Sequence, residues 1–149
     1  MLRKTMLTLC VALTLSQTVL ARNKTIVLKL NYPNIVTDGQ AAPIDDNGTA
    51  PLLINGRTYV PVRAVTEATE GEVSWDAPTK TATLTKDGKE LKLKVGSNTA
   101  YVDGNAAAID AAPVIRNDRM LLPIRFISES FGYRVDWNKY SKTITITKA

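Results

Sequence analysis

Histidine is absent from this chain of 149 residues, and cysteine occurs only once, as Cys10. Without histidine the protein has no imidazole base, no Ser–His or Cys–His nucleophile pair, and none of the usual histidine ligands of zinc and copper. With one cysteine it cannot close an internal disulfide. The fold must therefore be held by packing, and we expect neither a metal nor another cofactor.

Long apolar runs are also missing, apart from a short one near the N-terminus. Arg3 and Lys4 precede that run, which is followed by Val19-Leu20-Ala21, a plausible small-residue cleavage site. This order of charge, apolar stretch and cleavage site predicts a secretory signal peptide over residues 1–21. We therefore expect a secreted, extracellular protein, free or associated with the cell wall, with no membrane contact after cleavage.

Two other interpretations of the N-terminal stretch fit the residues less well. A membrane anchor would need about 20 apolar residues, and polar residues interrupt the run well before that length. A lipoprotein signal would acylate Cys10, but the bulky Leu9 stands where a small residue is expected. The secretory signal remains the favoured interpretation.

Excess charge is modest. The net charge of +5 falls to +3 when Arg3 and Lys4 are removed with the signal. A dedicated nucleic-acid binder should carry a concentrated basic stripe, so we expect no nucleic-acid partner. The remaining residues 22–149 are enough to build one self-sufficient core.

What the chain does have is an internal repeat. The segment that starts at Ala50 returns 62 residues later at Ala112, and a weaker upstream match is offset by 65 residues. The two copies span about 25–85 and 90–148, and such duplication indicates a repeated structural unit. The repeated signature residues are Arg57, Pro61, Arg63, Glu67 and Trp75 in the first copy, and Arg119, Pro123, Arg125, Glu129 and Trp137 in the second.

Each copy predicts a strand, two hairpins, a short helix and a final hairpin. Pro61 and Pro123 suit the first position of a helix, and Gly71 and Gly132 suit its left-handed end. Helices this short must pack on a sheet to be stable. The prediction is an α+β fold in one compact domain, with antiparallel strands wrapping the helices and with Thr143–Thr147 as an edge strand.

The motif Asn55-Gly56-Arg57-Thr58-Tyr59-Val60-Pro61-Val62-Arg63, followed by Trp75-Asp76, resembles the copper amine oxidase N-terminal-like, or stalk, domain of secreted and surface proteins of Gram-positive bacteria. The resemblance covers essentially residues 22–149. It implies an α+β fold and an accessory module, often a spacer. The copper, the quinone and the base of those enzymes belong to a separate catalytic domain, so the resemblance implies no copper site here.

The repeated arginines have two interpretations. Arg57 and Arg119 could bond strand carbonyls, while Arg63 and Arg125 could pair with the glutamate four residues further along the helix. Alternatively, their planar guanidinium groups could recognise an anionic wall polymer. Because they recur in both copies, we interpret them as structural.

Aromatic side chains are few and offer the other contact candidates. Trp75 and Trp137 share a strand face with valines, which predicts core positions rather than sugar platforms. Binding is then expected where the copies differ. The candidate ligand or partner contacts are Asn47, Tyr101, Tyr133 and Tyr140.

These observations favour a non-catalytic, exported interaction or spacer module, with a cell-wall polymer or a surface protein as its partner. One alternative is a carbohydrate-binding module that uses exposed tyrosines. A remote alternative is a glycan hydrolase that uses Glu67 and Glu129 as its carboxylate pair. Asp45, Asp46 and Asp110 are interpreted as turn residues.

Overall fold

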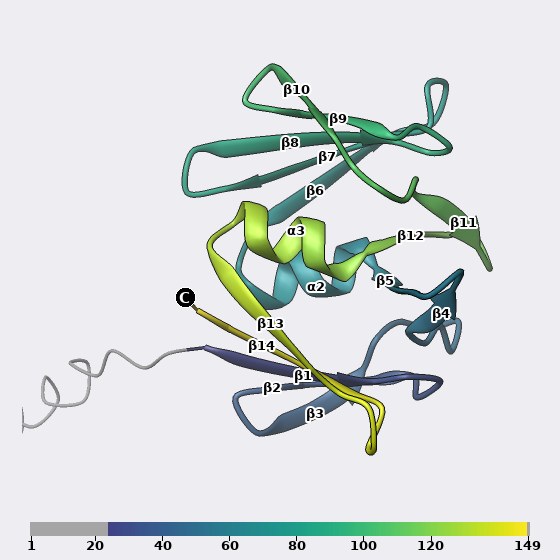
Figure 1. Ribbon diagram of the computed structural model, residues 1–149, viewed down its shortest axis with the longest axis vertical. Helices are drawn as coiled ribbons and strands as arrows, with labels where there is room; N and C mark the ends of the chain where they lie inside the picture. Colours follow the sequence, from purple (N-terminus) through teal and green to yellow (C-terminus); the bar gives the residue numbers. More distant parts are fainter. Residues whose placement is uncertain (1–23, 149) are drawn as a thin grey trace, which may run out of the picture.

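The computed structural model describes residues 24–148, which form a compact, mostly antiparallel β structure with two short helices (Figure 1). In chain order the elements are β1 (Thr25–Lys29), β2 (Asn34–Thr37), β3 (Gln40–Pro43), β4 (Leu52–Ile54), β5 (Arg57–Pro61), α2 (Val62–Ala68), β6 (Glu72–Asp76), β7 (Thr81–Lys86), β8 (Lys89–Lys94), β9 (Thr99–Val102), β10 (Asn105–Ala108), β11 (Val114–Arg116), β12 (Arg119–Pro123), α3 (Ile124–Ser130), β13 (Tyr133–Asn138) and β14 (Thr143–Lys148).

The strands form three sheets around the two helices. The middle of the chain forms one sheet, here called the central sheet, with the order β10-β9-β8-β7-β6. The two ends of the described chain form another, here called the terminal sheet, with the order β13-β14-β1-β2-β3. The helices α2 and α3 lie between these two sheets, and the four-stranded sheet β11-β12-β5-β4 lies at one side (Figure 1). Side chains from both five-stranded sheets and both helices share one hydrophobic core. The molecule therefore has one core, not two lobes.

Each five-stranded sheet combines strands from both sequence copies. In the central sheet, β7 of the first copy pairs with β8 of the second through the turn 86–89. In the terminal sheet, β1 pairs with β14, so the two ends of the described chain lie side by side. The register is the same in both, since Thr85 faces Glu90 in one and Thr147 faces Thr25 in the other. The copies are thus interlocked, and neither completes a five-stranded sheet alone.

Alternation along the strands explains this packing. In β7 and β14 the inward residues are apolar and fully buried, while threonines occupy the half-exposed face between them. Period-two alternation is what a sheet with one buried face requires. The buried inward residues of these two strands are Ala82, Leu84, Ile144 and Ile146.

Equivalent aspartates fix the hairpin that follows the first strand of each copy. Asp38 and Asp103 have φ values of 50° and 51°, which short polar side chains tolerate in tight turns. Each carboxylate accepts a hydrogen bond at 2.8 Å from a neighbouring strand amide, that of Thr25 or Glu90. The same contact therefore holds the start of β1 and of β8.

The helices differ from their prediction at both ends. Pro61 and Pro123 are the N-cap residues and the last residues of β5 and β12, so each helix begins one residue later. At the C-terminal end, Gly132 has a left-handed φ of 83°, as predicted. In the first copy the left-handed residue is Glu70, with φ of 66°. Gly71 has a different role, because a Cβ there would lie 2.9 Å from the Thr85 carbonyl oxygen.

The predicted edge position of Thr143–Thr147 is wrong. This segment forms β14, which pairs with β13 on one side and with β1 on the other. The prediction failed because the pairing partner β1 lies more than a hundred residues earlier in the chain. The predicted signal peptide over residues 1–21 and Cys10 lie outside the described residues. Among residues 24–148, no helix is long and apolar enough to cross a membrane.

Candidate binding grooves

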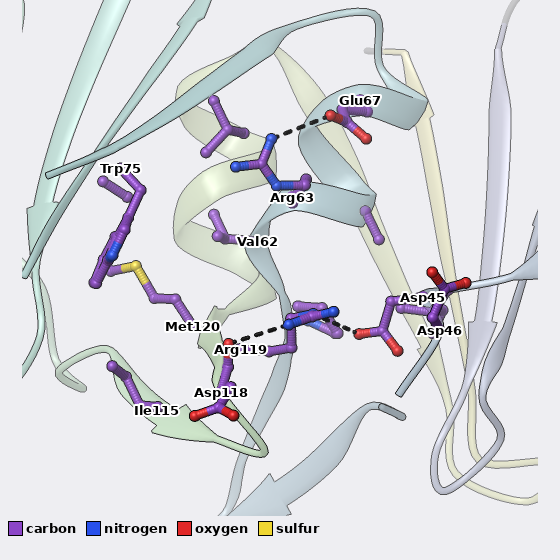
Figure 2. A pocket seen from close by; sticks show the side chains of 15 residues that line it. Asp45, Asp46, Val62, Arg63, Glu67, Trp75, Ile115, Asp118, Arg119 and Met120 are labelled. Carbon is purple, nitrogen blue, oxygen red and sulfur yellow. Dashed lines mark hydrogen bonds and ion pairs between the residues drawn. The ribbon is translucent and has the colours of Figure 1, made fainter. Parts of the chain in front are cut away.

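Two surface grooves occupy equivalent places in the two copies. The first, here called the Trp75 groove, has a volume of about 630 Å³ and lies beside the start of α2 (Figure 2). The apolar side chains of Val62, Ile115 and Met120 line it, and Met120 reaches toward the Trp75 ring. Its charged lining residues are Asp45, Asp46, Glu67, Asp118, Arg63 and Arg119.

The second, here called the Trp137 groove, has a volume of about 560 Å³ and lies beside the start of α3. Its apolar lining includes Ile124, Phe126 and Ile144, where the Trp75 groove has Val62, Ala64 and Ala82. The larger side chains account for the smaller volume. Its charged lining residues are Arg57, Arg125 and Asp110.

Each groove contains an ion pair that joins the two copies. In the Trp137 groove, the Arg57 guanidinium lies 2.8 Å from Asp110 Oδ2. In the Trp75 groove, Arg119 Nε lies 3.1 Å from Asp45 Oδ2 (Figure 2). Each arginine follows a hairpin turn of one copy and its aspartate belongs to the other. Both arginines thus form ion pairs with aspartates that the sequence had indicated only as turn residues.

The two aspartates differ in how firmly they are held. The Asp45 side chain is 14% exposed, while that of Asp110 is 71% exposed. Partial burial opposes ionisation of Asp45, but hydrogen bonds from Thr49 and Asn47 and the charge of Arg119 outweigh it. The net result is a pKa of Asp45 below its ordinary value. Asp45 is therefore a structural carboxylate, poorly suited to act as a proton donor.

The second pair of repeated arginines forms the predicted helical ion pairs. Arg63 Nη1 lies 3.3 Å from Glu67 Oε2, and Arg125 lies at the same distance from Glu129. All four side chains are more than half exposed, so each pair contributes little to stability. Each guanidinium therefore stays accessible at the rim of its groove.

The predicted core position of the tryptophans is wrong, because Trp75 and Trp137 are each 41% exposed. Along β13, Val135 is buried, but Trp137 lies two residues further along the strand. There the ring lines the groove beside the helix start, together with the proline and first helical residues. Each Trp thus lies on the same strand face as its valine, but at an open groove rather than in the core.

The residues predicted to contact a ligand do not gather at one place. Tyr133 is only 5% exposed, with Lys86 and Lys148 over its ring, so its predicted surface role is wrong. Tyr101 lies exposed on β9, away from the lining of both grooves. Asn47 donates from its side chain to the Asn117 carbonyl and so joins two loops.

Tyr140 is the exception, since it is 87% exposed at the turn between β13 and β14. It lines a third, shallower hollow of about 560 Å³ together with Trp137 and Lys139. Of the two predicted hydrolase carboxylates, Glu67 lines the Trp75 groove, whereas Glu129 lies outside the lining of the Trp137 groove. The lining of the described grooves therefore does not bring this pair together.

The comparison with known families gives one match. The chain matches the copper amine oxidase N-terminal domain over residues 46–146, which is more than half of its length. The chain belongs to this family. It is a family of non-catalytic accessory domains, and the N-terminal domain does not itself bind copper. Within residues 24–148, no cluster of three or more histidine, cysteine, aspartate or glutamate residues could hold a metal ion.

Sequence reasoning missed both grooves for one reason. It treated residues that recur in both copies as structural and sought binding only where the copies differ. The signal was nonetheless present, because each Trp recurs with a pair of arginines, and exposed aromatic and arginine side chains are typical of binding surfaces.

Proposed function

We propose that this protein is an exported, non-catalytic module of the cell surface that binds an anionic wall glycan through the Trp137 groove. The observation that carries the proposal is the half-exposed Trp137 ring beside two guanidinium groups, Arg57 and Arg125. An aromatic ring provides an apolar platform for the face of a sugar. Guanidinium groups bind carboxylate and phosphate oxygens well.

The charge of the two grooves decides between them. With ion-pair partners included, Arg57 and Arg125 of the Trp137 groove are matched by Asp110 and Glu129, whereas the Trp75 groove has Asp46 and Asp118 in excess of its ion pairs. The excess carboxylates repel an anionic polymer from the Trp75 groove, while the exposed guanidinium groups of the Trp137 groove meet no such repulsion. The proposed site is therefore one groove of the pair, and the domain itself acts as the spacer between wall and partner.

Export is a separate part of the proposal. It rests on the signal-like pattern of residues 1–21 and on membership of an accessory-domain family. The N-terminal sequence of the protein recovered from culture medium or from the wall should begin near Arg22. A protein that keeps its first 21 residues and stays inside the cell would contradict export.

Sedimentation with purified peptidoglycan tests the binding site. We expect the wild type to pellet with the wall at low salt and to be released at high salt, because screening weakens exposed charge contacts. Trp137→Ala should stay in the supernatant. Trp75→Ala is the matched control, since it removes an equally exposed ring from the equivalent groove and should pellet normally.

The tyrosine alternative is read in the same assay. Tyr101→Ala, which lies outside the lining of both grooves, should pellet like the wild type if the Trp137 groove is the site. Loss of pelleting in Tyr140→Ala with normal pelleting of Trp137→Ala would favour the tyrosine alternative. A wild type that never pellets at low salt would end the wall-binding proposal and leave a spacer or a protein-binding role. Equal pelleting of Trp137→Ala and wild type would show that the wall-binding site is not the Trp137 groove.

A further inference from the structure

The turn between β13 and β14 forms an exposed cationic and aromatic tip, Asn138–Lys142. Tyr140 is the most exposed large hydrophobic residue of the described chain, and Lys139 Nζ lies 5.4 Å from the centre of its ring. The Asn138 side chain accepts hydrogen bonds from the Tyr140 and Ser141 amides at 2.9 and 3.1 Å. The turn is therefore held in shape, and it projects beyond the terminal sheet (Figure 1).

The equivalent turn of the central sheet, Asp76–Lys80, lacks this character. Ala77 stands at the position of Lys139, and Pro78 stands at the position of Tyr140. The Asp76 carboxylate accepts a hydrogen bond from the Thr79 amide at 3.3 Å. The exposed aromatic ring and one of its flanking lysines thus belong to the second copy alone.

A second departure from the repeat concerns the Trp75 groove. Asp46 and Asp118 line this groove, whereas the equivalent positions of the second groove carry Ala111 and Gly56. These two substitutions account for most of its excess of carboxylates. The acidic groove and the basic tip are therefore differences of opposite charge, each present in one copy only.

We propose that the Trp75 groove binds the Asn138–Lys142 tip of a second copy of this protein. Tyr140 would pack against Trp75 and Met120, which form the apolar wall of the groove (Figure 2). Aromatic rings attract one another in offset or edge-to-face arrangements. The lysines of the tip would lie near Asp46 and Asp118, which have no acidic equivalent in the second copy.

The geometry of such a contact determines the assembly. Tip and groove are different surfaces of one chain, so each added copy leaves a free tip at one end and a free groove at the other. Heterologous contacts of this kind produce open chains or closed rings rather than simple dimers. Because a five-residue tip makes a small interface, we expect weak association that grows with protein concentration and falls with salt.

Sedimentation velocity of the purified protein over a range of concentrations tests this proposal. The average mass should rise past that of a dimer at low salt. Tyr140→Ser and Trp75→Ala should each remain monomeric, because one lacks the tip and the other lacks the groove. Mixed in equal amounts, these two variants should form a dimer and nothing larger, since one complementary pair of surfaces survives.

Two further variants guard against loss of folding. Asp118→Gly introduces the residue of the other copy at a position with φ of 59°, where glycine is unstrained. It should keep the thermal stability of the wild type and weaken association ~tenfold, the loss expected for a contributing interface residue. Tyr101→Ser removes an exposed tyrosine outside both grooves and should assemble like the wild type.

Several results would overturn the proposal. A wild type that stays monomeric up to about millimolar concentration, so that any dissociation constant lies above that value, excludes a second copy as the occupant. A mixture of the two variants that stays monomeric excludes the tip–groove contact. If the Trp75 groove does not bind the tip of a second copy but binds an unrelated basic peptide, the groove belongs to another partner. Wall binding through Trp137 is measured separately, so either proposal can fail alone.

Discussion

The central and terminal sheets have the same strand order and the same register, but the chain connects them differently. The central sheet is one continuous stretch, β6 to β10, with a tight turn between β7 and β8. The terminal sheet joins β1–β3 from the start of the described chain to β13 and β14 from its end. The structural unit therefore combines strands of both sequence copies, and the turn 86–89 lies inside a sheet.

The two sheets also differ in the side chains that they present to the core and the grooves. In the central sheet, Leu93 has Ala82 and Ala100 as its cross-strand neighbours. In the terminal sheet, the equivalent Leu28 has Ile144 and Ile35. Small neighbours leave the Trp75 groove wider, and large neighbours fill the Trp137 groove. Two sheets with the same strand order thus border two different grooves.

The largest expected effect comes from truncating this equivalent pair of leucines. Both are 1% exposed, so Leu28→Ala and Leu93→Ala should each lower the free energy of unfolding by about 2–5 kcal/mol. Leu93→Ala should cost more, because three alanines would then lie side by side and no neighbour could fill the cavity. Urea unfolding measures both. A larger loss for Leu28→Ala would contradict the packing difference.

The next effect concerns the two ion pairs between the copies. Asp45→Asn should lower the free energy of unfolding by about 1–2 kcal/mol at neutral pH, since a hydrogen-bonded carboxylate loses its charge. Asp110→Asn should cost less than about 1 kcal/mol, because its ion pair is exposed to solvent. Thermal unfolding of both variants at pH 7 measures the difference.

The pH dependence of stability tests whether the charge of Asp45 causes this difference. The pKa of Asp45 is lowered in the folded protein, so the carboxylate stabilises the fold above its ordinary pKa of 3.8 and loses that effect as the pH falls. The gap between wild type and Asp45→Asn should therefore close below about pH 4. A gap that stays constant down to pH 2 would show that charge is not the cause.

The smallest expected effect is that of exchanging the connections of the two sheets. A circular permutant would join Lys148 to Lys24 by Asp-Gly, which copies the turn 86–89, and would open the chain between Asp87 and Gly88. Because the two sheets share their register, its melting temperature should lie within a few degrees of the wild type. Failure to fold would mean that the β7–β8 turn is required in a way that its equivalent position is not.

The sequence predicted the parts of this fold that depend on local residues. Alternating threonines gave the strands, and the Asn55-Gly56 pair gave a hairpin turn with positive φ at both residues. The positions of both helices, directly after Pro61 and Pro123, were also predicted from local residues. The pairing of β1 with β14 could not be predicted, because it joins segments at opposite ends of the described chain. The local residue pattern of a strand does not determine which other strand pairs with it.

The candidate site was predicted less well. The sequence pattern identified the arginines and tryptophans, but it could not show that both rings stand at open grooves. Each groove is lined by residues from distant segments of the chain, such as Asp46 and Ile115 at the Trp75 groove. The tyrosine candidates also differ in exposure, which the sequence alone does not show. Tyr133 is buried where its equivalent Gly71 leaves no room for a side chain, whereas Tyr140 stands free at a turn.

Under both proposals, two equivalent grooves have diverged in what they bind. The chain has two tryptophans, one in each groove, so Trp75→Phe and Trp137→Phe leave a single fluorescent reporter in the groove that keeps its tryptophan. Titration with soluble peptidoglycan fragments should change the emission of Trp137 and leave that of Trp75 unchanged, while rising protein concentration should change the emission of Trp75, the residue that receives the tip. Equal responses of both reporters to the fragments, or no response of Trp75 to protein concentration, would contradict this divergence.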